Sequence, residues 1–360
     1  MWMLDNQTPF AADRGWVRDK NGAEVWIVAV KGSFLIAPDG SLSLAATQEK
    51  VLHAPKYRGA PGKSALLYPE DLVHLKPTSD ILLHGHAYAP QGQPSPQMDV
   101  LMKVGPVSKV VRVFGDRFWR VGLIGLKISD PEPFVRMPLT TERAFGGRDE
   151  NFPEEKDFKW DPRNPLGTGF GTDAAHVAGH RLPNIESLRE LISSWKDRPA
   201  PACFGPIARD WMPRVRYAGT YGQKWEKERQ PLLPEDFDER FFQCAPEDQR
   251  PPHHLKGGET VELVNLSSTG VLRFALPRVT LSFRTIFTDG EETHRAVIHT
   301  VIIEPDVPRV IVVWHTHLPC HPRVLKLRTT IIRRKLRLKS VDGGTVEDFQ
   351  AAAEPEGGSA

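Results

Sequence analysis

Four side chains that could bind a metal ion stand within WHTHLPCH, residues 314–321. They are His315, His317, Cys320 and His321. Imidazole and thiolate are ligands that zinc and copper accept well. If the preceding apolar residues form a strand that ends near Trp314, His315 and His317 share one face, because side chains alternate along a strand. Pro319 is expected to break the strand before Cys320, which spoils a compact ligand set.

A catalytic zinc needs a third protein ligand and an open coordination position. We therefore interpret the histidines of WHTHLPCH as the end of a strand. A metal-dependent hydrolase that uses His315, His317 and Cys320 remains the alternative.

Other motifs that could do chemistry are weaker. A second H-x-H sequence occurs at His84–His86, and His253 and His254 are adjacent, but thirteen histidines in 360 residues make such pairs expected by chance. GTGFG at 167–171 does not follow an expected strand and lacks the G-K-[ST] of a phosphate loop. The chain has no G-x-S-x-G and no recognisable cysteine nucleophile. We expect neither an enzyme nor a cofactor.

The segment LKLRTTIIRRKLRLKS, residues 325–340, has seven basic residues and no acidic one. Such a segment can bind nucleic acid, but no aromatic side chain is interleaved for base stacking. We interpret it as a charged edge strand that resists aggregation. A basic-patch nucleic-acid binder is the second alternative function, and docking of an acidic protein is a further possibility for this surface.

Composition bounds the class of protein. Hydrophobic residues make up 40% and charged residues 26%, which is typical of a chain with a real core. The net charge of +2 gives no global attraction to nucleic acid or membrane. Three scattered cysteines argue against a disulfide framework, and no apolar stretch has the length of a membrane helix. MWMLDNQTPF lacks a signal-peptide pattern, so we expect a cytoplasmic protein without membrane insertion.

The elements that must position these residues are mostly β-strands. Runs rich in β-branched residues alternate with turn sequences in the first and last thirds of the chain. A hairpin is expected over FWRVGLIGLKI, residues 118–128. The last three expected strands predict an antiparallel meander. The expected strands are 24–30, 98–104, 109–114, 261–266, 271–276, 279–287, 293–305 and 308–314.

The middle third differs, because it is dense in Gly, Pro and aromatic residues with little apolar periodicity. One helix is predicted there: Asn184 would cap IESLRELISSW, whose apolar residues follow helical spacing. The fold class is mainly β, with antiparallel sheets that are sandwich-like or form two packed units, and one or two short helices. The expected division is an N-terminal β region at 1–137, a loop-rich segment at 138–258, a C-terminal β meander at 259–340 continuous with 1–258, and a mobile tail at 341–360.

Ten phrases between Trp26 and Leu276 occur in a specific order. They are VKGSFLIAPDGSL, DILLHGHAYAP, VFGDRFW, TTERAFGGRD, NPLGTGF, LPNIE, FGPIARDWMPR, GTYGQKW, PLLPEDFDERFFQCAPEDQR and LKGGETVELVNL. Together they resemble a domain-of-unknown-function family encoded beside type VI secretion spike and effector genes. The segment after LPNIE looks more helical than that pattern, and WHTHLPCH and the basic segment lie beyond it.

The resemblance implies a cytoplasmic adaptor or chaperone, which is not an enzyme. Such a protein binds a cognate type VI secretion effector, often through a PAAR-containing or N-terminal region, and helps to load it onto the VgrG spike. Neither nucleic acid nor membrane is an expected partner.

Charged and amide side chains within these phrases adjoin glycines and turns, where they usually tie loops together by hydrogen bonds and ion pairs. The expected loop-locking residues are Glu142, Arg143, Asp149, Asn164, Asn184 and Glu186. Aromatic side chains and arginine dominate interface hot spots. The expected partner-binding residues are Trp211, Tyr221, Trp225, Arg240 and Arg250; the two arginines are also expected to brace their own segments.

Overall fold

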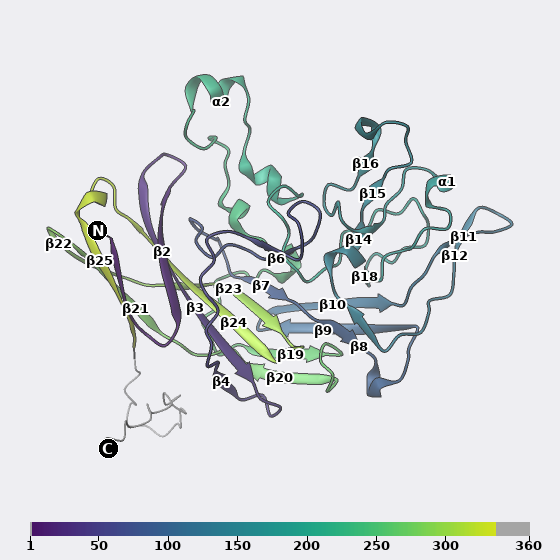
Figure 1. The fold of residues 1–360 in the computed structure, drawn as a ribbon, viewed down its shortest axis with the longest axis horizontal. Helices are drawn as coiled ribbons and strands as arrows, with labels where there is room; N and C mark the ends of the chain where they lie inside the picture. The colour runs from purple at the N-terminus through teal and green to yellow at the C-terminus, as the bar shows by residue number, and fades with distance from the viewer. Residues whose placement is uncertain (1, 336–360) are drawn as a thin grey trace, which may run out of the picture.

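The computed structural model describes residues 2–335, so the expected mobile tail lies outside the described residues. Strands dominate and most neighbouring strands run antiparallel, which confirms the mainly β prediction. Three large sheets organise the chain (Figure 1). The α-helices are short: α1 (Ala174–Val177) and α2 (Gln223–Glu228). The remaining helical turns are 3-10: Pro90–Gly92, Thr141–Arg143, Glu155–Asp157, Arg214–Ala218, Glu239–Phe242, Glu247–Gln249 and Val324–Lys326.

A six-stranded sheet forms the centre of the molecule, in the order β2-β3-β24-β23-β7 with β4 beside β3. Its strands are β2 (Ala11–Arg18), β3 (Glu24–Ile36), β24 (Arg309–Pro319), β23 (Val297–Glu304), β7 (Asp80–Leu83) and β4 (Leu42–Leu44). β3 and β24 are buried along nearly their whole length. One face of the sheet enters the main core, and Ile302 and Ile311 on the other face pack against Cys244 and Ala245.

Two further sheets share the main core. One has the order β18-β10-β9-β19-β20 and the other β1-β25-β21-β22. Their strands are β18 (Ile185–Ser187), β10 (Val107–Phe114), β9 (Gln97–Val104), β19 (Thr260–Val264), β20 (Val271–Ala275), β1 (Met3–Gln7), β25 (Leu327–Arg334), β21 (Leu281–Phe287) and β22 (Gly290–His294). Val28, Met102 and Phe283, one from each large sheet, belong to the same apolar cluster. The first and last thirds of the chain therefore build one continuous core.

Five short strand pairs complete the described fold. They are β5 (Lys56–Tyr57) with β6 (Leu66–Tyr68), β8 (His86–Tyr88) with β13 (Arg136–Pro138), β11 (Trp119–Val121) with β12 (Leu126–Ile128), β14 (Phe145–Gly146) with β17 (Thr168–Gly169), and β15 (Arg148–Asp149) with β16 (Lys159–Trp160). The β11–β12 pair confirms the predicted hairpin. A small separate core lies beneath β11, β14 and α1 and contains Trp119, Phe145, Val177, Leu182 and Ile192.

The predicted helix after Asn184 is wrong. Ile185–Ser187 is strand β18, paired with β10, and turns follow it. The carboxylate of Glu186 accepts a hydrogen bond from the backbone nitrogen of Ile192 at 2.8 Å. A helix needs its N–H groups for its own i−4 carbonyls, so tertiary contacts override the local apolar spacing here.

The C-terminal strands also differ from the predicted single meander. β21 and β22 pair in the four-stranded sheet, whereas β23 and β24 pair in the six-stranded sheet. The basic segment was expected at an edge, but its strand β25 lies between β1 and β21. Inner strands must satisfy hydrogen bonds on both sides, and β1 supplies the second side with a parallel pairing. Residues 336–340 of the basic segment lie outside the described residues.

Candidate partner-binding surface

The histidines of WHTHLPCH do not form an open pair. β24 continues past Trp314, where the strand was expected to end, as far as Pro319, which lies opposite Val25. The strand stops before Cys320, as predicted. His315 is only 1% exposed and stacks on His299, with ring centroids 4.2 Å apart and planes at 11°. His317 lies further along the same strand and is exposed.

Within the part of the chain that the structure describes, no third metal ligand joins His315 and His317. The thiol of Cys320 faces the backbone oxygen of Glu24 at 3.6 Å. Burial lowers the pKa of His315 to about 3, which keeps the ring neutral. Burial also raises the pKa of the Cys320 thiol to about 11, which disfavours a thiolate ligand. Within residues 2–335, no group of three His, Cys, Asp or Glu side chains is arranged to hold a metal ion.

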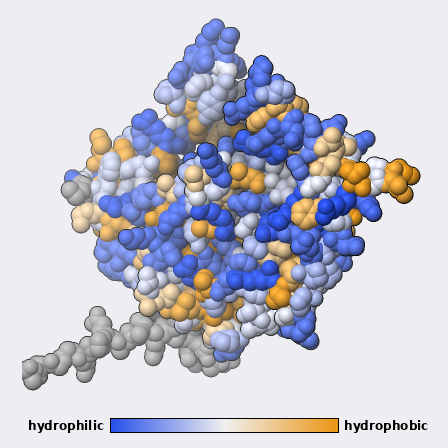
Figure 2. All heavy atoms as spheres, turned by 45° about the vertical axis from the view of Figure 1, so that its right-hand side comes forward, coloured by the Kyte–Doolittle hydropathy of each residue, from blue (hydrophilic) through white to orange (hydrophobic). Residues whose placement is uncertain are grey.

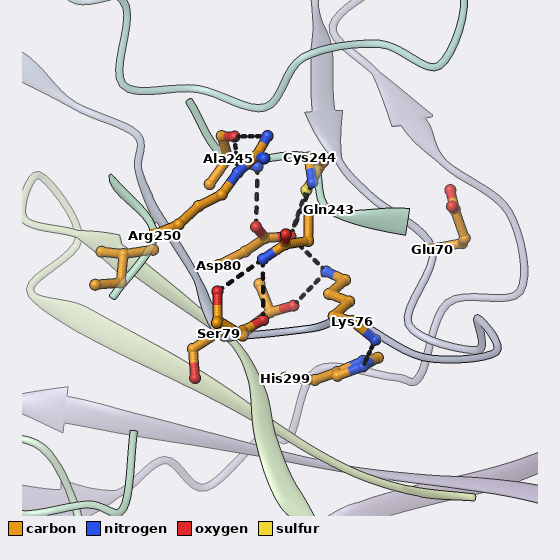
Figure 3. Close-up of polar contacts among 12 residues, drawn as sticks. Glu70, Lys76, Ser79, Asp80, Gln243, Cys244, Ala245, Arg250 and His299 are labelled. Carbon is orange, nitrogen blue, oxygen red and sulfur yellow. Dashed lines mark hydrogen bonds and ion pairs between the residues drawn. The ribbon is translucent and has the colours of Figure 1, made fainter. Parts of the chain in front are cut away.

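Lys76 and Asp80 form a buried ion pair on the face of the six-stranded sheet that is opposite the main core (Figure 3). The Lys76 Nζ atom is 2.8 Å from Asp80 Oδ2 and 2.8 Å from the Thr300 hydroxyl, and the Lys76 and Asp80 side chains are 1% and 0% exposed. Asp80 also accepts hydrogen bonds from the backbone nitrogens of Cys244 and Ala245, at 2.9 and 3.2 Å. Burial alone would raise the pKa of Asp80, but the Lys76 ammonium and these donors hold it below its usual range.

The contacts of the Lys76–Asp80 pair indicate a structural role. The Cys244 thiol donates to Asp80, with Sγ and Oδ2 3.3 Å apart. Burial, followed by the charge of Asp80, raises the pKa of Cys244 to about 12, so the sulfur is a thiol and a poor nucleophile at neutral pH. All three side chains are sealed from solvent. The pair therefore fastens the segment around Cys244 to the sheet.

Asn164 stands at a close crossing of the middle-segment loops. Its side-chain amide donates to two backbone carbonyl oxygens at 2.8 and 3.0 Å. A Cβ on Gly146, whose φ is +143°, would lie 2.2 Å from the Asn164 backbone oxygen, so only glycine fits. A Cβ on Gly167 would lie 2.5 Å from the Asn164 amide nitrogen. These glycines of AFGG and GTGFG thus permit close backbone approach. Nearby, Glu142 accepts from the backbone nitrogen of Ala65 at 3.1 Å.

Asp149 holds a second crossing. Its buried carboxylate accepts from the backbone nitrogen and hydroxyl of Thr172, at 2.8 and 2.6 Å, and lies 2.8 Å from Nδ1 of His176. Burial opposes ionisation, but these hydrogen bonds hold the pKa of Asp149 well below its usual range. The carboxylate therefore stays charged and ties β15 to the segment before α1.

Arg143, Asn184 and Glu186 make a third set of contacts. An Arg143 guanidinium nitrogen donates to the Asn184 side-chain oxygen at 2.7 Å, and the Asn184 amide donates to Asp116 at 3.0 Å. Glu186 is buried and forms an ion pair with Arg117. All six expected loop-locking side chains thus hydrogen-bond within the chain.

Residues 219–237 leave the body as a closed loop that carries α2, which we call the α2 arm; it stands at the top of Figure 1. The Asp236 carboxylate closes its base by accepting from the Thr220 backbone nitrogen and hydroxyl, at 2.9 and 2.7 Å. Arg229 donates to the backbone oxygen of Lys20 at 2.7 Å and to the Asn21 side chain at 3.0 Å. These contacts brace the arm against the β2–β3 turn.

The α2 arm presents an aromatic pair beside a hollow. Tyr221 is 54% exposed and packs edge-on against Trp225, with ring centroids 4.8 Å apart. The Trp225 indole donates to the Leu232 backbone oxygen at 2.8 Å, which fixes the ring. A pocket of about 240 Å³ lies beside it, and its lining includes Trp225, Pro234, Glu228 and Glu235.

The other three predicted partner contacts are less suited to the role. Trp211 is buried at 6% exposure, and the Arg250 guanidinium turns inward onto the Ala245 backbone oxygen at 2.6 and 2.8 Å. Neither offers a surface to a partner, because their own loops use them as packing and bracing groups. Arg240 is exposed, but Asp238 holds its guanidinium at 2.6 Å and the group lies over the Tyr217 ring.

A family model described as an uncharacterized protein conserved in bacteria, DUF2169, matches residues 21–315. The chain belongs to the DUF2169 family. No curated protein and no solved structure matches the chain. The family match includes the α2 arm, the Lys76–Asp80 pair and the loop crossings, and it ends at His315, before His317 and β25.

Sequence reasoning missed the Lys76–Asp80 pair of this DUF2169 member. KPTSD reads as a solvated turn, and no local signal shows that the segment around Cys244 covers it. The pocket beside Trp225 was also missed, because it forms only where the two ends of the α2 arm meet. Among the described residues, no helix is long and apolar enough to cross a membrane.

Proposed function

We propose that this DUF2169 member is a non-catalytic cytoplasmic adaptor. It binds a type VI secretion effector through the effector's PAAR-containing or N-terminal region and helps to load it onto the VgrG spike. The observation that carries the proposal is the α2 arm, which holds Tyr221 in solvent beside a preformed pocket. The order of the sequence phrases supplies the secretion context.

The arm suits recognition of a protein segment. Tyrosine and tryptophan offer large, rigid contact areas with one polar group, which is why they dominate interface hot spots. Because the Trp225 hydrogen bond and the Arg229 brace already order the arm, little conformational entropy remains to be lost on binding. Lys224 at the pocket lies 3.7 Å from Glu235, whereas Glu228 forms no salt bridge within the described residues and favours a partner segment with an apolar side chain next to a basic one.

The test uses a type VI secretion effector from the genes that neighbour this one, co-expressed with the tagged full chain and then titrated with purified protein. Tyr221→Ala is expected to weaken binding about 30-fold, the loss of a typical hot spot. Trp225→Ala is expected to weaken binding as well, because it removes the ring that orders the pocket. Trp160→Ala is the matched control, since Trp160 is 51% exposed on β16, outside the arm.

If the wild-type chain binds neither the effector nor the spike protein, the proposed adaptor function is wrong. Unchanged affinity of Tyr221→Ala would instead remove the α2 arm as the binding surface. The hydrolase alternative is not proposed, because His315 is buried against His299 and Cys320 faces a backbone oxygen.

A further inference from the structure

The β11–β12 hairpin carries an uncovered apolar tip. In Figure 1 it projects from the body at the right, well away from the α2 arm, and Figure 2 shows a hydrophobic knob at the corresponding edge. Val121, Leu123 and Ile124 are 77%, 107% and 97% exposed. Single exposed apolar residues are ordinary, but here three are concentrated at the end of one projecting element.

The hairpin is held rigidly by the body. Trp119 at the start of β11 is 2% exposed and belongs to the small core of the middle segment. The turn closes with a 2.8 Å hydrogen bond from the Gly122 nitrogen to the Gly125 oxygen. The tip is therefore presented in one conformation, which lowers the entropy cost of docking it.

Two cations stand directly behind the tip. Arg120 and Lys127 occupy opposite positions in the register of β11 and β12, so their side chains leave the same face. Both are exposed, and neither forms a salt bridge with a residue in the part of the chain that the structure describes. Like charges directly across a strand pair are unfavourable, and an external anion would relieve that repulsion.

We infer that the hairpin is a second docking element, which inserts Leu123 and Ile124 into an apolar pocket of a protein partner rimmed by carboxylates that face Arg120 and Lys127. The inference rests on the proposed function, and the partner is the effector that the α2 arm binds. Two basic residues suit such a rim. An anionic bilayer is usually recognised by clusters of about four to eight basic residues, which this hairpin does not supply.

The inference is tested by titrating the purified full chain against the neighbouring effector. The double substitution Leu123→Asp with Ile124→Asp is expected to weaken binding about 30-fold or more. Arg120→Glu with Lys127→Glu is expected to weaken binding about tenfold at low salt and to flatten its salt dependence. Circular dichroism is expected to stay unchanged in both variants, because Leu123 and Ile124 are wholly exposed and Arg120 and Lys127 are exposed as well.

Leu325→Asp is the matched control, because Leu325 is an aliphatic side chain 82% exposed on another element. It is expected to bind like the wild type. If Tyr221→Ala weakens binding and the tip variants do not, the adaptor function stands and the hairpin inference is overturned. If the wild-type chain binds no effector, both fall.

A lipid occupant gives a different result. Flotation with vesicles of phosphatidylcholine and phosphatidylglycerol is expected to leave the wild-type chain unbound. Co-flotation that Leu123→Asp with Ile124→Asp abolishes would assign the tip to a bilayer and overturn the inference.

Discussion

At the residue level, the face of the central sheet opposite the main core carries buried polar side chains beside a small apolar cluster. Lys76 and Asp80 neutralise each other there, and Asp80 also accepts from the loop that carries Cys244. The imidazole rings of His299 and His315 stack on each other, and burial lowers the pKa of both rings, which keeps them neutral. Each arrangement makes a prediction about stability.

Asp80→Asn is expected to lower the free energy of unfolding by about 3–5 kcal/mol, because it leaves the Lys76 charge buried without its counter-ion. Urea unfolding of the full chain measures the change. Asp130→Asn, at an exposed position, is the control and is expected to leave stability unaltered. A loss for Asp80→Asn no larger than that of the control would show that the pair does not brace the loop.

The buried histidines predict a loss of stability in acid. In the unfolded chain a histidine takes up a proton near pH 6.5, whereas burial lowers the pKa of His315 to about 3 in the fold. The contribution of neutral, buried His315 to the free energy of unfolding is therefore fully present above about pH 6.5. It is lost as the pH drops towards the pKa in the folded protein. His315→Gln is expected to reduce the fall between about pH 7.5 and 5.5 by roughly 1 kcal/mol, measured by urea unfolding.

His180→Gln provides the control for this experiment, because His180 is exposed on the surface. It is expected to leave the pH dependence as in the wild type. An equal pH dependence in His315→Gln and the wild type would mean that His315 is not buried in a neutral state in solution.

At the scale of elements, two projections leave the body and differ in how they are held. The β11–β12 hairpin depends on backbone pairing and on Trp119 in a small core. The α2 arm depends on side-chain contacts at its base, chiefly those of Asp236 and Arg229. The arm should therefore be easier to loosen by a single substitution.

Arg229→Ala is expected to loosen the α2 arm without changing the global unfolding transition. It removes the hydrogen bonds to the β2–β3 turn, and local opening needs much less energy than global unfolding. Chymotrypsin should then cleave faster at Tyr221 and Trp225. Lys227→Ala, at an exposed position of α2, is the control. Equal cleavage rates in both variants would show that the brace does not order the arm.

At the scale of the whole molecule, distant parts of the chain complete one another's sheets. β3 pairs with β24, β9 with β19, and β1 runs parallel to β25. Because one apolar cluster joins the three large sheets, the fold depends on contacts between the first and last hundred residues. The edge that β1 covers is the most accessible test of this dependence.

Deletion of residues 1–8 is expected to lower the free energy of unfolding and to promote association between chains. It removes the partner of one edge of β25 and the packing of Leu4 on the main core, and an uncovered strand edge can pair with another chain. Urea unfolding and light scattering measure the two effects. Met3→Ala, which keeps the backbone pairing, is expected to change neither; a deletion that behaves like it would contradict the prediction.

Local sequence patterns were enough to predict most individual elements of the fold. Apolar runs and turn residues predicted most large strands, the 118–128 hairpin and the mainly β class. They could do so because strand alternation and turn conformation each depend on only a few neighbouring residues. Residue type alone made Tyr221 and Trp225 candidates for partner contact, and that role stays a prediction. The ordered phrases indicated a domain-of-unknown-function family, and the match to DUF2169 over residues 21–315 supports that part of the prediction.

Which strands pair and which side chains reach solvent depends on the tertiary fold. The apolar spacing after Asn184 predicted a helix, but pairing with β10 and the burial of Glu186 made a strand and turns. Trp211 and Tyr221 are both aromatic residues in loops, yet packing buries the first and exposes the second. Burial and pairing depend on segments distant in the sequence, as when Ile185 of β18 pairs with Val113 of β10, so no local pattern could specify them.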